Sequence, residues 1–134
     1  MSKTICQTVV FKNTTPEMLY DIYMDAKKHG KAIGGKVNIS TKIGSSYSSW
    51  NDYIKGITHQ LVKGKMIVQS WRSSDFKSGD LDSTLVLWFE KKGNHASLNM
   101  IHVNVPDHQY HQVKGGWNDY YWKPWKKYLQ SPRP

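Results

Sequence analysis

Histidine is the side chain in this sequence best suited to acid–base or metal chemistry, and the 134-residue chain has six of them. His108 and His111 are three residues apart, so a helix would place both imidazoles on one face. Asp107 or His102 could then supply a third ligand for zinc. The spacing is not that of the H-E-x-x-H motif. We therefore favour adventitious binding of zinc or nickel, and predict no physiological metal and no cofactor.

His102 alternates with Leu98 and Met100 in a β-prone run, so the three side chains should share one face of a strand. If that face lines a cavity, the imidazole could orient a ligand or transfer a proton. The alternative, which we favour, is a core histidine hydrogen-bonded to a backbone or tyrosine oxygen.

Arg72 follows Trp71 and shares its predicted strand face with Ser70 and Val68. Its guanidinium could clamp a carboxylate inside a cavity. The interpretation we favour is an ion pair with an acidic residue at the sheet edge, either Asp82 or Asp75.

Nucleophilic catalysis finds little support. Cys6, the one cysteine, lies in a strand-like run without an adjacent base. The chain has no G-x-S-x-G, Walker or G-x-G-x-x-G motif. The predicted cavity strands carry no pair of carboxylates, which glycoside chemistry would need. We therefore predict no catalytic residues and favour a protein that is not an enzyme.

Length and composition indicate one domain over residues 1–134, with 38% hydrophobic and 13% aromatic residues. No apolar run is long enough to span a membrane, and the first twelve residues have no signal-peptide core. We therefore expect a cytoplasmic protein.

The net charge of +9 favours anionic partners, but its distribution is uneven. Eight lysines lie in the basic stretch Lys27–Lys65, with Asp52 as its one acid, whereas the segment from Arg72 to Glu90 is acidic. Only two of the 19 basic residues are arginine, the side chain that base and phosphate recognition favours. We therefore favour a solvated basic face over a nucleic-acid site.

The elements that must position these residues follow from periodicity. A strand is predicted over residues 4–11, and an amphipathic helix from Pro16 to Ala26, with Thr14 and Glu17 at capping-box spacing. Residues 27–30 should end that helix, and a short second helical turn follows to Ile33. After Pro106 one long amphipathic helix is expected, bent at Pro124. Between the helices, short alternating runs typical of an antiparallel meander occupy residues 37–39, 45–50, 53–62, 65–72, 83–91 and 95–103.

Six short motifs cover nearly the whole chain in sequence order. They are T-P-E-M-L-Y at 15–20, I-V-Q-S-W-R at 67–72, D-S-T at 82–84, H-V-N-V-P at 102–106, G-W-N-D-Y-Y-W at 116–122 and W-K-K-Y-L at 125–129. Their order and spacing resemble the START-like (SRPBCC) superfamily, and within it the branch named for the activator of heat-shock protein 90 ATPase.

The resemblance implies an α+β helix-grip fold: a curved antiparallel sheet of about six to seven strands wrapped around a long C-terminal helix. One or two short helices would follow the first strand, and a cavity would lie between sheet and helix. The residues agree, because a sheet face and a helix face must bury one another and both carry large aromatics here. The candidate cavity residues are Tyr47, Trp71, Arg72, Trp88, Met100, His102, Trp117 and Tyr121.

We predict a non-catalytic binding module for a small lipid-like or aromatic ligand. One alternative is a chaperone partner that contacts heat-shock protein 90 through the basic stretch; another is a polyketide cyclase-type enzyme that depends on His102. In eukaryotes the family's namesake has an N-terminal domain that contacts the chaperone. This chain starts a few residues before its first predicted strand, so we expect that domain to be missing, which argues against direct stimulation of the ATPase.

Overall fold

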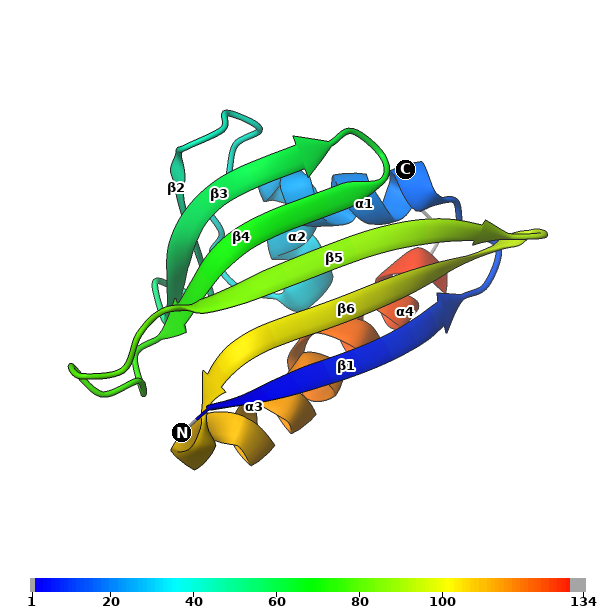
Figure 1. Ribbon diagram of the computed structural model, residues 1–134. Coiled ribbons are helices and arrows are strands. Elements are labelled where there is room, and N and C mark those ends of the chain that lie inside the picture. Colours follow the sequence, from blue (N-terminus) through cyan, green and yellow to red (C-terminus); the bar gives the residue numbers. More distant parts are fainter. Residues whose placement is uncertain (1, 131–134) are drawn as a thin grey trace.

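A six-stranded antiparallel sheet curves around the C-terminal helix and confirms the predicted helix-grip fold (Figure 1). The computed structural model describes residues 2–130, so Met1 and residues 131–134 of the predicted domain lie outside it. The strand order is β1-β6-β5-β4-β3-β2. The predicted run at 37–39 forms only an isolated bridge, from Asn38 to Ser48. The strands are β1 (Ser2–Phe11), β2 (Ser46–Ser49), β3 (Ile54–Val62), β4 (Met66–Ser73), β5 (Ser83–Lys92) and β6 (His95–Pro106).

All the described helices lie on one side of the sheet (Figure 1). Two short helices follow β1, namely α1 (Pro16–Met24) and α2 (Ala26–Ile33). The long C-terminal helix is continuous through η1 (Asp107–Gln109), α3 (Tyr110–Trp117), the π-helical turn η2 (Asn118–Trp122) and α4 (Lys123–Gln130). Within residues 2–130, no helix combines the length and apolar character needed to cross a membrane.

Helix α1 begins at Pro16 as predicted, but its capping residue and its C-terminal end differ from those expected. Thr15, not Thr14, is the N-cap, and its hydroxyl accepts from the Met18 N–H at 3.1 Å. Proline at the first helical position leaves capping to the residue just before it. Asp25 then ends α1 in an extended conformation and caps α2 by accepting from the Lys28 N–H at 3.0 Å. The boundary therefore falls before residues 27–30, because an aspartate cap starts a new helix there.

Pro124 leads to a π-helical turn where a simple bend was expected. Proline has no N–H to donate, so the ordinary helical hydrogen-bond pattern is interrupted near it. The Lys123 N–H donates to the Asn118 carbonyl, five residues back. This wider turn allows the adjacent residues Tyr121 and Trp122 to be buried together.

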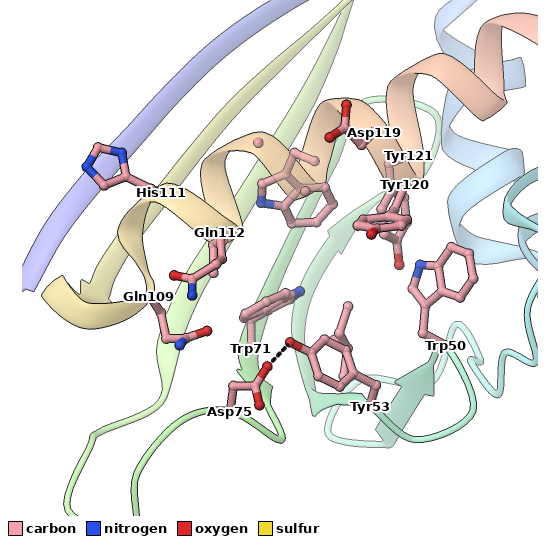
Figure 2. Close-up of a pocket in the computed structure, with 15 residues that line it drawn as sticks. Trp50, Tyr53, Trp71, Asp75, Gln109, His111, Gln112, Asp119, Tyr120 and Tyr121 are labelled. Carbon is pink, nitrogen blue, oxygen red and sulfur yellow. Dashed lines mark hydrogen bonds between the residues drawn. The ribbon is translucent and has the colours of Figure 1, made fainter.

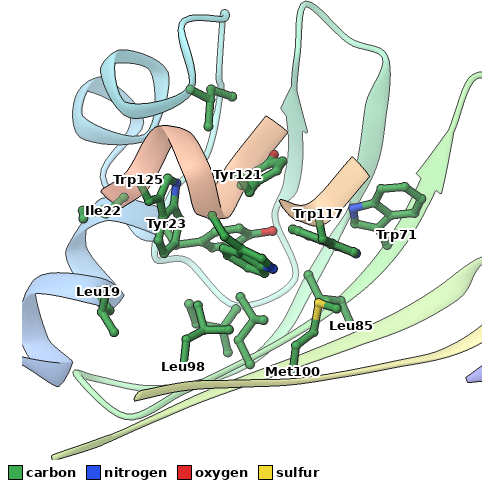
Figure 3. Packing of buried hydrophobic residues seen from close by; sticks show 14 of the residues in the cluster. Leu19, Ile22, Tyr23, Trp71, Leu85, Leu98, Met100, Trp117, Tyr121 and Trp125 are labelled. Carbon is green, nitrogen blue, oxygen red and sulfur yellow. The ribbon is translucent and has the colours of Figure 1, made fainter. Parts of the chain in front are cut away.

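The core lies between the concave sheet face and the helices (Figure 3). Side chains alternate along each strand, so β4 buries Ile67, Gln69 and Trp71 while their neighbours face outward. The helices contribute the aromatic residues Tyr23, Trp117, Tyr121, Trp122 and Trp125. The core therefore depends on rigid rings, which leave gaps wherever no side chain fills the space between them.

Candidate functional site

An aromatic pocket of about 620 Å³ opens between the α3 half of the C-terminal helix and the β3–β4 side of the sheet (Figure 2). This volume is in the range of small-molecule sites. Six aromatic rings border it. The lining residues are Trp50, Tyr53, Ile54, Trp71, Asp75, Gln109, His111, Gln112, Val113, Gly115, Gly116, Trp117, Asp119, Tyr120 and Tyr121.

A left-handed turn places Trp50 at one side of the pocket. Trp50, Asn51 and Asp52 have φ values of 51°, 56° and 72°, a left-handed conformation that asparagine and aspartate tolerate but that is unfavourable for tryptophan. Two hydrogen bonds hold the turn: the Lys36 N–H donates to the Asn51 side-chain oxygen at 2.8 Å, and the Asn51 N–H donates to the Lys36 carbonyl at 3.1 Å. The Trp50 ring consequently packs edge-on against Tyr120, 5.6 Å between centroids.

The loop at residues 73–82 borders the pocket opposite the helix. Asp75 accepts a 2.6 Å hydrogen bond from the Tyr53 hydroxyl (Figure 2). Burial, together with this hydrogen bond, raises the pKa of Tyr53. Phe76 packs against Trp71, and Arg72 donates to the carbonyls of Lys77 and Asp80 at 2.6 Å each. These two hydrogen bonds from Arg72 hold the loop in place from the side facing away from the pocket.

His102 lies behind the pocket in a directional chain of hydrogen bonds. An indole nitrogen can only donate, so the Trp117 N–H donates to His102 Nδ1 at 3.1 Å. The proton of the neutral imidazole is then on Nε2 and is donated to Ser83 Oγ at 2.8 Å. The Ser83 hydroxyl in turn donates to the Trp71 carbonyl at 2.7 Å. Both ring nitrogens are therefore occupied.

This arrangement is opposite to that of a catalytic serine–histidine pair. A general base needs a free lone pair on the nitrogen that faces the hydroxyl, but here that nitrogen carries the proton. Burial lowers the pKa of His102 to about 3, so the ring is neutral near pH 7. The favoured core interpretation is thus what the structure shows, with serine and tryptophan as the partners in place of a backbone or tyrosine oxygen.

A second buried histidine supports the pocket from the other side. His29 Nδ1 donates to the Tyr23 carbonyl at 2.8 Å, which leaves Nε2 to accept from the Tyr121 hydroxyl at 3.3 Å. That hydroxyl also bonds Ser49 Oγ at 2.9 Å. Burial lowers the pKa of His29 to about 4 and raises that of Tyr121. Tyr121 therefore presents its ring to the pocket while its hydroxyl is engaged behind it.

Two indole donors at the pocket have no acceptor. The Nε1 atoms of Trp71 and Trp50 are buried and, within the described part of the chain, lack a hydrogen-bond partner. Figure 2 shows both nitrogens directed toward the space between the two indole rings. An unpaired buried donor is unfavourable, so a bound acceptor would be stabilised there.

Three of the predicted cavity residues come together in the pocket: Trp71, Trp117 and Tyr121. Tyr47, Met100 and His102 are buried but lie outside the lining. The Tyr47 hydroxyl donates to the Ser70 carbonyl at 2.7 Å, and Met100 packs from the sheet beneath the aromatic rings (Figure 3).

The predicted placement of Arg72 and Trp88 in the cavity is corrected by the structure, because both side chains face away from the pocket. Trp71 is buried, and strand alternation sends the adjacent Arg72 to the convex face, where it pairs with Asp82 at 3.2 Å. In β5 the buried positions are 83, 85, 87 and 89, so Trp88 also faces outward and borders a separate shallow groove beside Met66. The favoured ion pair of Arg72 is confirmed, and its role as a carboxylate clamp inside the cavity is wrong.

The predicted histidine pair does not form a metal cluster with its suggested third ligands. His108 Nε2 contacts Asp80 at 2.8 Å, His111 lines the pocket, and His102 is occupied in the core. Within residues 2–130 no group of three metal-ligating side chains occurs.

Sequence reasoning missed several pocket residues, chiefly Trp50, Tyr53, Asp75 and Tyr120. Tyr120 lies in the predicted C-terminal helix three residues after Trp117, so helical spacing could have included it. The turn signal at Asn51-Asp52 locates Trp50 beside a turn, but the direction of its ring depends on left-handed backbone angles that residue type does not reveal.

Comparisons with known proteins agree with this fold. A family model described as "Activator of Hsp90 ATPase homolog 1-like protein" matches residues 13–130. The activator of 90 kDa heat shock protein ATPase homolog of Dictyostelium discoideum is 21% identical over 104 residues, which are 77% of this chain and 27% of that protein. The chain thus spans about a quarter of that relative's length.

Two solved structures illustrate the structural likeness. PFC0360w, an HSP90 activator from Plasmodium falciparum, has a TM-score of 0.85 and 24% identity over 98% of this chain and 99% of that one. CalU16 from Micromonospora echinospora has a TM-score of 0.82 and 13% identity over 99% and 78% of the two chains. At these identities the likeness concerns the fold.

Proposed function

The chain belongs to the family of activator of Hsp90 ATPase homolog 1-like proteins, and we propose that it is a non-catalytic binding module whose aromatic pocket takes a small hydrophobic or aromatic ligand. The observation that supports this most is the pocket of about 620 Å³ bordered by six aromatic rings. Burial of a flat ligand against such rings is favourable at roughly 25 cal/mol per Å² of apolar surface. The rings are already held in place, so little order must be gained on binding.

The polar groups around the pocket favour binding over catalysis. His102 has both nitrogens engaged and sits behind Trp117, and the Tyr121 hydroxyl is bonded to Ser49 and His29. The cyclase-type alternative relied on His102 as a free acid–base group, and these contacts give it less support.

The pocket proposal is tested by filling the space. Gly116 lies on the pocket side of α3, and a Cβ there would meet only the Tyr120 ring, at an ordinary 3.7 Å. Gly116→Leu should therefore fold and obstruct the pocket, whereas Gly116→Ala should leave most of it open. The probe is fluorene, a flat three-ring hydrocarbon without polar groups, followed by backbone amide NMR.

We expect fluorene to shift resonances of pocket residues in the wild type and in Gly116→Ala, and to bind at least tenfold more weakly to Gly116→Leu. Native mass spectrometry of protein purified without heat or organic solvent is the companion measurement. A retained small mass in the wild type that Gly116→Leu lacks supports the proposal. Equal binding by all three proteins would contradict it.

A second candidate function is that of a chaperone partner, favoured by the family and by PFC0360w, which is described as an HSP90 activator. The basic stretch Lys27–Lys65 supports this candidate, because all eight of its lysines are exposed. Such a surface would attract an acidic partner surface and lose affinity as salt increases.

The test is capture of heat-shock protein 90 from the same cell at low and at raised salt. Lys28→Glu with Lys31→Glu reverses charge on exposed positions of α2, and Lys92→Glu at the β5–β6 turn is the matched control outside the stretch. Binding that falls with salt and with the α2 variants, but not with the control, supports this candidate. Absence of binding at low salt removes it.

A further inference from the structure

The two unpaired indole donors restrict what the pocket can hold. Trp71 is only 4% exposed, and its buried N–H has no acceptor within the described residues; the same holds for the N–H of Trp50. Of the tyrosine hydroxyls at the pocket, those of Tyr53 and Tyr121 are already used, by Asp75 and by Ser49 with His29, whereas Tyr120 is 59% exposed and can bond water. Among the described residues that line the pocket, the buried side-chain groups without a partner are thus both donors.

Charge restricts the ligand further. The charged side chains bordering the pocket are Asp75 and Asp119, and among residues 2–130 no lysine or arginine borders it. A protein of net charge +9 therefore has a pocket with acidic edges. A ligand carboxylate would be repelled there and would find no cation to pair with. A fatty-acid headgroup does not fit these groups.

We propose that the ligand is an uncharged planar aromatic carbonyl compound, whose oxygen accepts from the indole N–H of Trp71, with the Trp50 N–H as the second donor. This inference rests on the proposed function, because it names the ligand class for the same pocket. The aromatic walls bury the rings, and the carbonyl supplies the acceptor that the two buried donors lack.

The sharpest test compares 9-fluorenone with fluorene, which have the same three-ring shape and differ in a carbonyl against a methylene group. Fluorenone is the better hydrated of the two, so a pocket without free donors would favour fluorene. We expect the wild type to bind fluorenone about tenfold more tightly than fluorene. In Trp71→Phe this preference should disappear or reverse, whereas Trp88→Phe, outside the pocket on the convex face, should keep it.

The indole resonances give a readout that needs no variant to bind. In ¹H–¹⁵N spectra of the wild type, fluorenone should move the Nε1–H signals of Trp71 and Trp50 downfield and slow their exchange. The Trp125 indole is an internal control, because it is also buried without a partner but does not line the pocket. Trp122, which already donates to Gln7 at 2.8 Å, is the second control.

The outcomes separate the two proposals. If fluorene and fluorenone bind equally and the Trp71 and Trp50 indole signals respond alike to both, the carbonyl inference is overturned while the pocket function stands. If neither compound binds, the proposed function fails and the inference with it. Because the pocket edges are acidic, 9-fluorenone-2-carboxylate should bind more weakly than fluorenone. Tighter binding of the carboxylate would overturn the exclusion of anionic ligands.

Discussion

The two ends of the interface between the sheet and the C-terminal helix use the same kinds of side chain, yet one end is closed and the other is open. At the α4 end, α1 supplies Leu19, Ile22 and Tyr23, and Tyr23 packs against Trp125 (Figure 3). At the α3 end, the helix is met by a turn at residues 50–53 and a loop at 73–82, and the pocket remains between them.

The difference shows that the pocket follows from where the short helices lie, and not from a shortage of large residues. The two ends also differ in whether their buried donors have hydrogen-bond acceptors. At the closed end the Tyr23 hydroxyl donates to Gln69 at 2.8 Å, and the Trp122 indole donates to Gln7. At the open end Trp50 and Trp71 lack acceptors. Trp125 is an exception at the closed end, since its N–H is unpaired although rings surround it.

The largest predicted effect contrasts one tryptophan from each end. Trp125→Ala should lower the free energy of unfolding by about 4 kcal/mol, because it leaves a cavity in a closed core. Trp50→Ala, at the half-buried pocket edge, should lower it by only about 1 kcal/mol while weakening ligand binding. Urea unfolding of both variants measures the contrast. Equal losses of stability would mean that the pocket end is packed as tightly as the α4 end.

The sequence predicts most of the frame but only three of the 15 residues that line the pocket. Alternation correctly places Trp71 and His102 on the concave face, and helical periodicity places Trp117 and Tyr121 against it. These patterns depend on local geometry, which residue spacing encodes directly.

The errors arise where residue type was preferred to spacing. Trp71 and Arg72 are neighbours on one strand, so both cannot face the same cavity, and the same alternation excludes Trp88. A cavity between sheet and helix was expected from the family resemblance, but its position at the α3 end could not be predicted, because it depends on how far α1 and α2 reach along the sheet. The inward direction of Trp50 depends on three successive left-handed residues, which is likewise a tertiary outcome.

The next effect concerns the hydrogen-bond chain that supports the open end. His102→Ala removes the acceptor of the Trp117 N–H and the donor to Ser83, so it should lower the unfolding free energy by about 3 kcal/mol. His102→Gln keeps an oxygen to accept and an amide to donate, and should recover part of this. If glutamine is as damaging as alanine in thermal and urea unfolding, the hydrogen-bond chain is not the source of the stability.

The two buried histidines that support the pocket, His29 and His102, predict a pH dependence of stability. Folded His29 and His102 have pKa values of about 4 and about 3, against 6.5 for an ordinary histidine. Between those values and pH 6.5 the unfolded chain binds protons that the folded chain excludes. Stability is therefore complete above about pH 6.5 and falls as the pH decreases, by about 1.3 kcal/mol per histidine between pH 7.5 and pH 5.5.

Urea unfolding at these two pH values measures the change, and His102→Gln separates the contribution of His102 from that of His29. The glutamine variant does not titrate, so its stability should fall between the two pH values by about 1.3 kcal/mol less than that of the wild type. A wild type equally stable at both pH values would show that the histidines take up protons without unfolding.

The smallest effect is a gain in stability at the open end. Gly115 is an exposed residue of α3, and a Cβ there would have no atom within 4 Å. Alanine loses less backbone entropy than glycine in a helix, so Gly115→Ala should raise the unfolding free energy by about 0.5–1 kcal/mol. Ligand binding should be nearly unchanged, since a methyl group at this exposed position occupies little of the pocket. A variant that is more stable but loses fluorene binding would show that the pocket needs a deformable α3, and that the open end is held open by weak helix formation as much as by the position of α1 and α2.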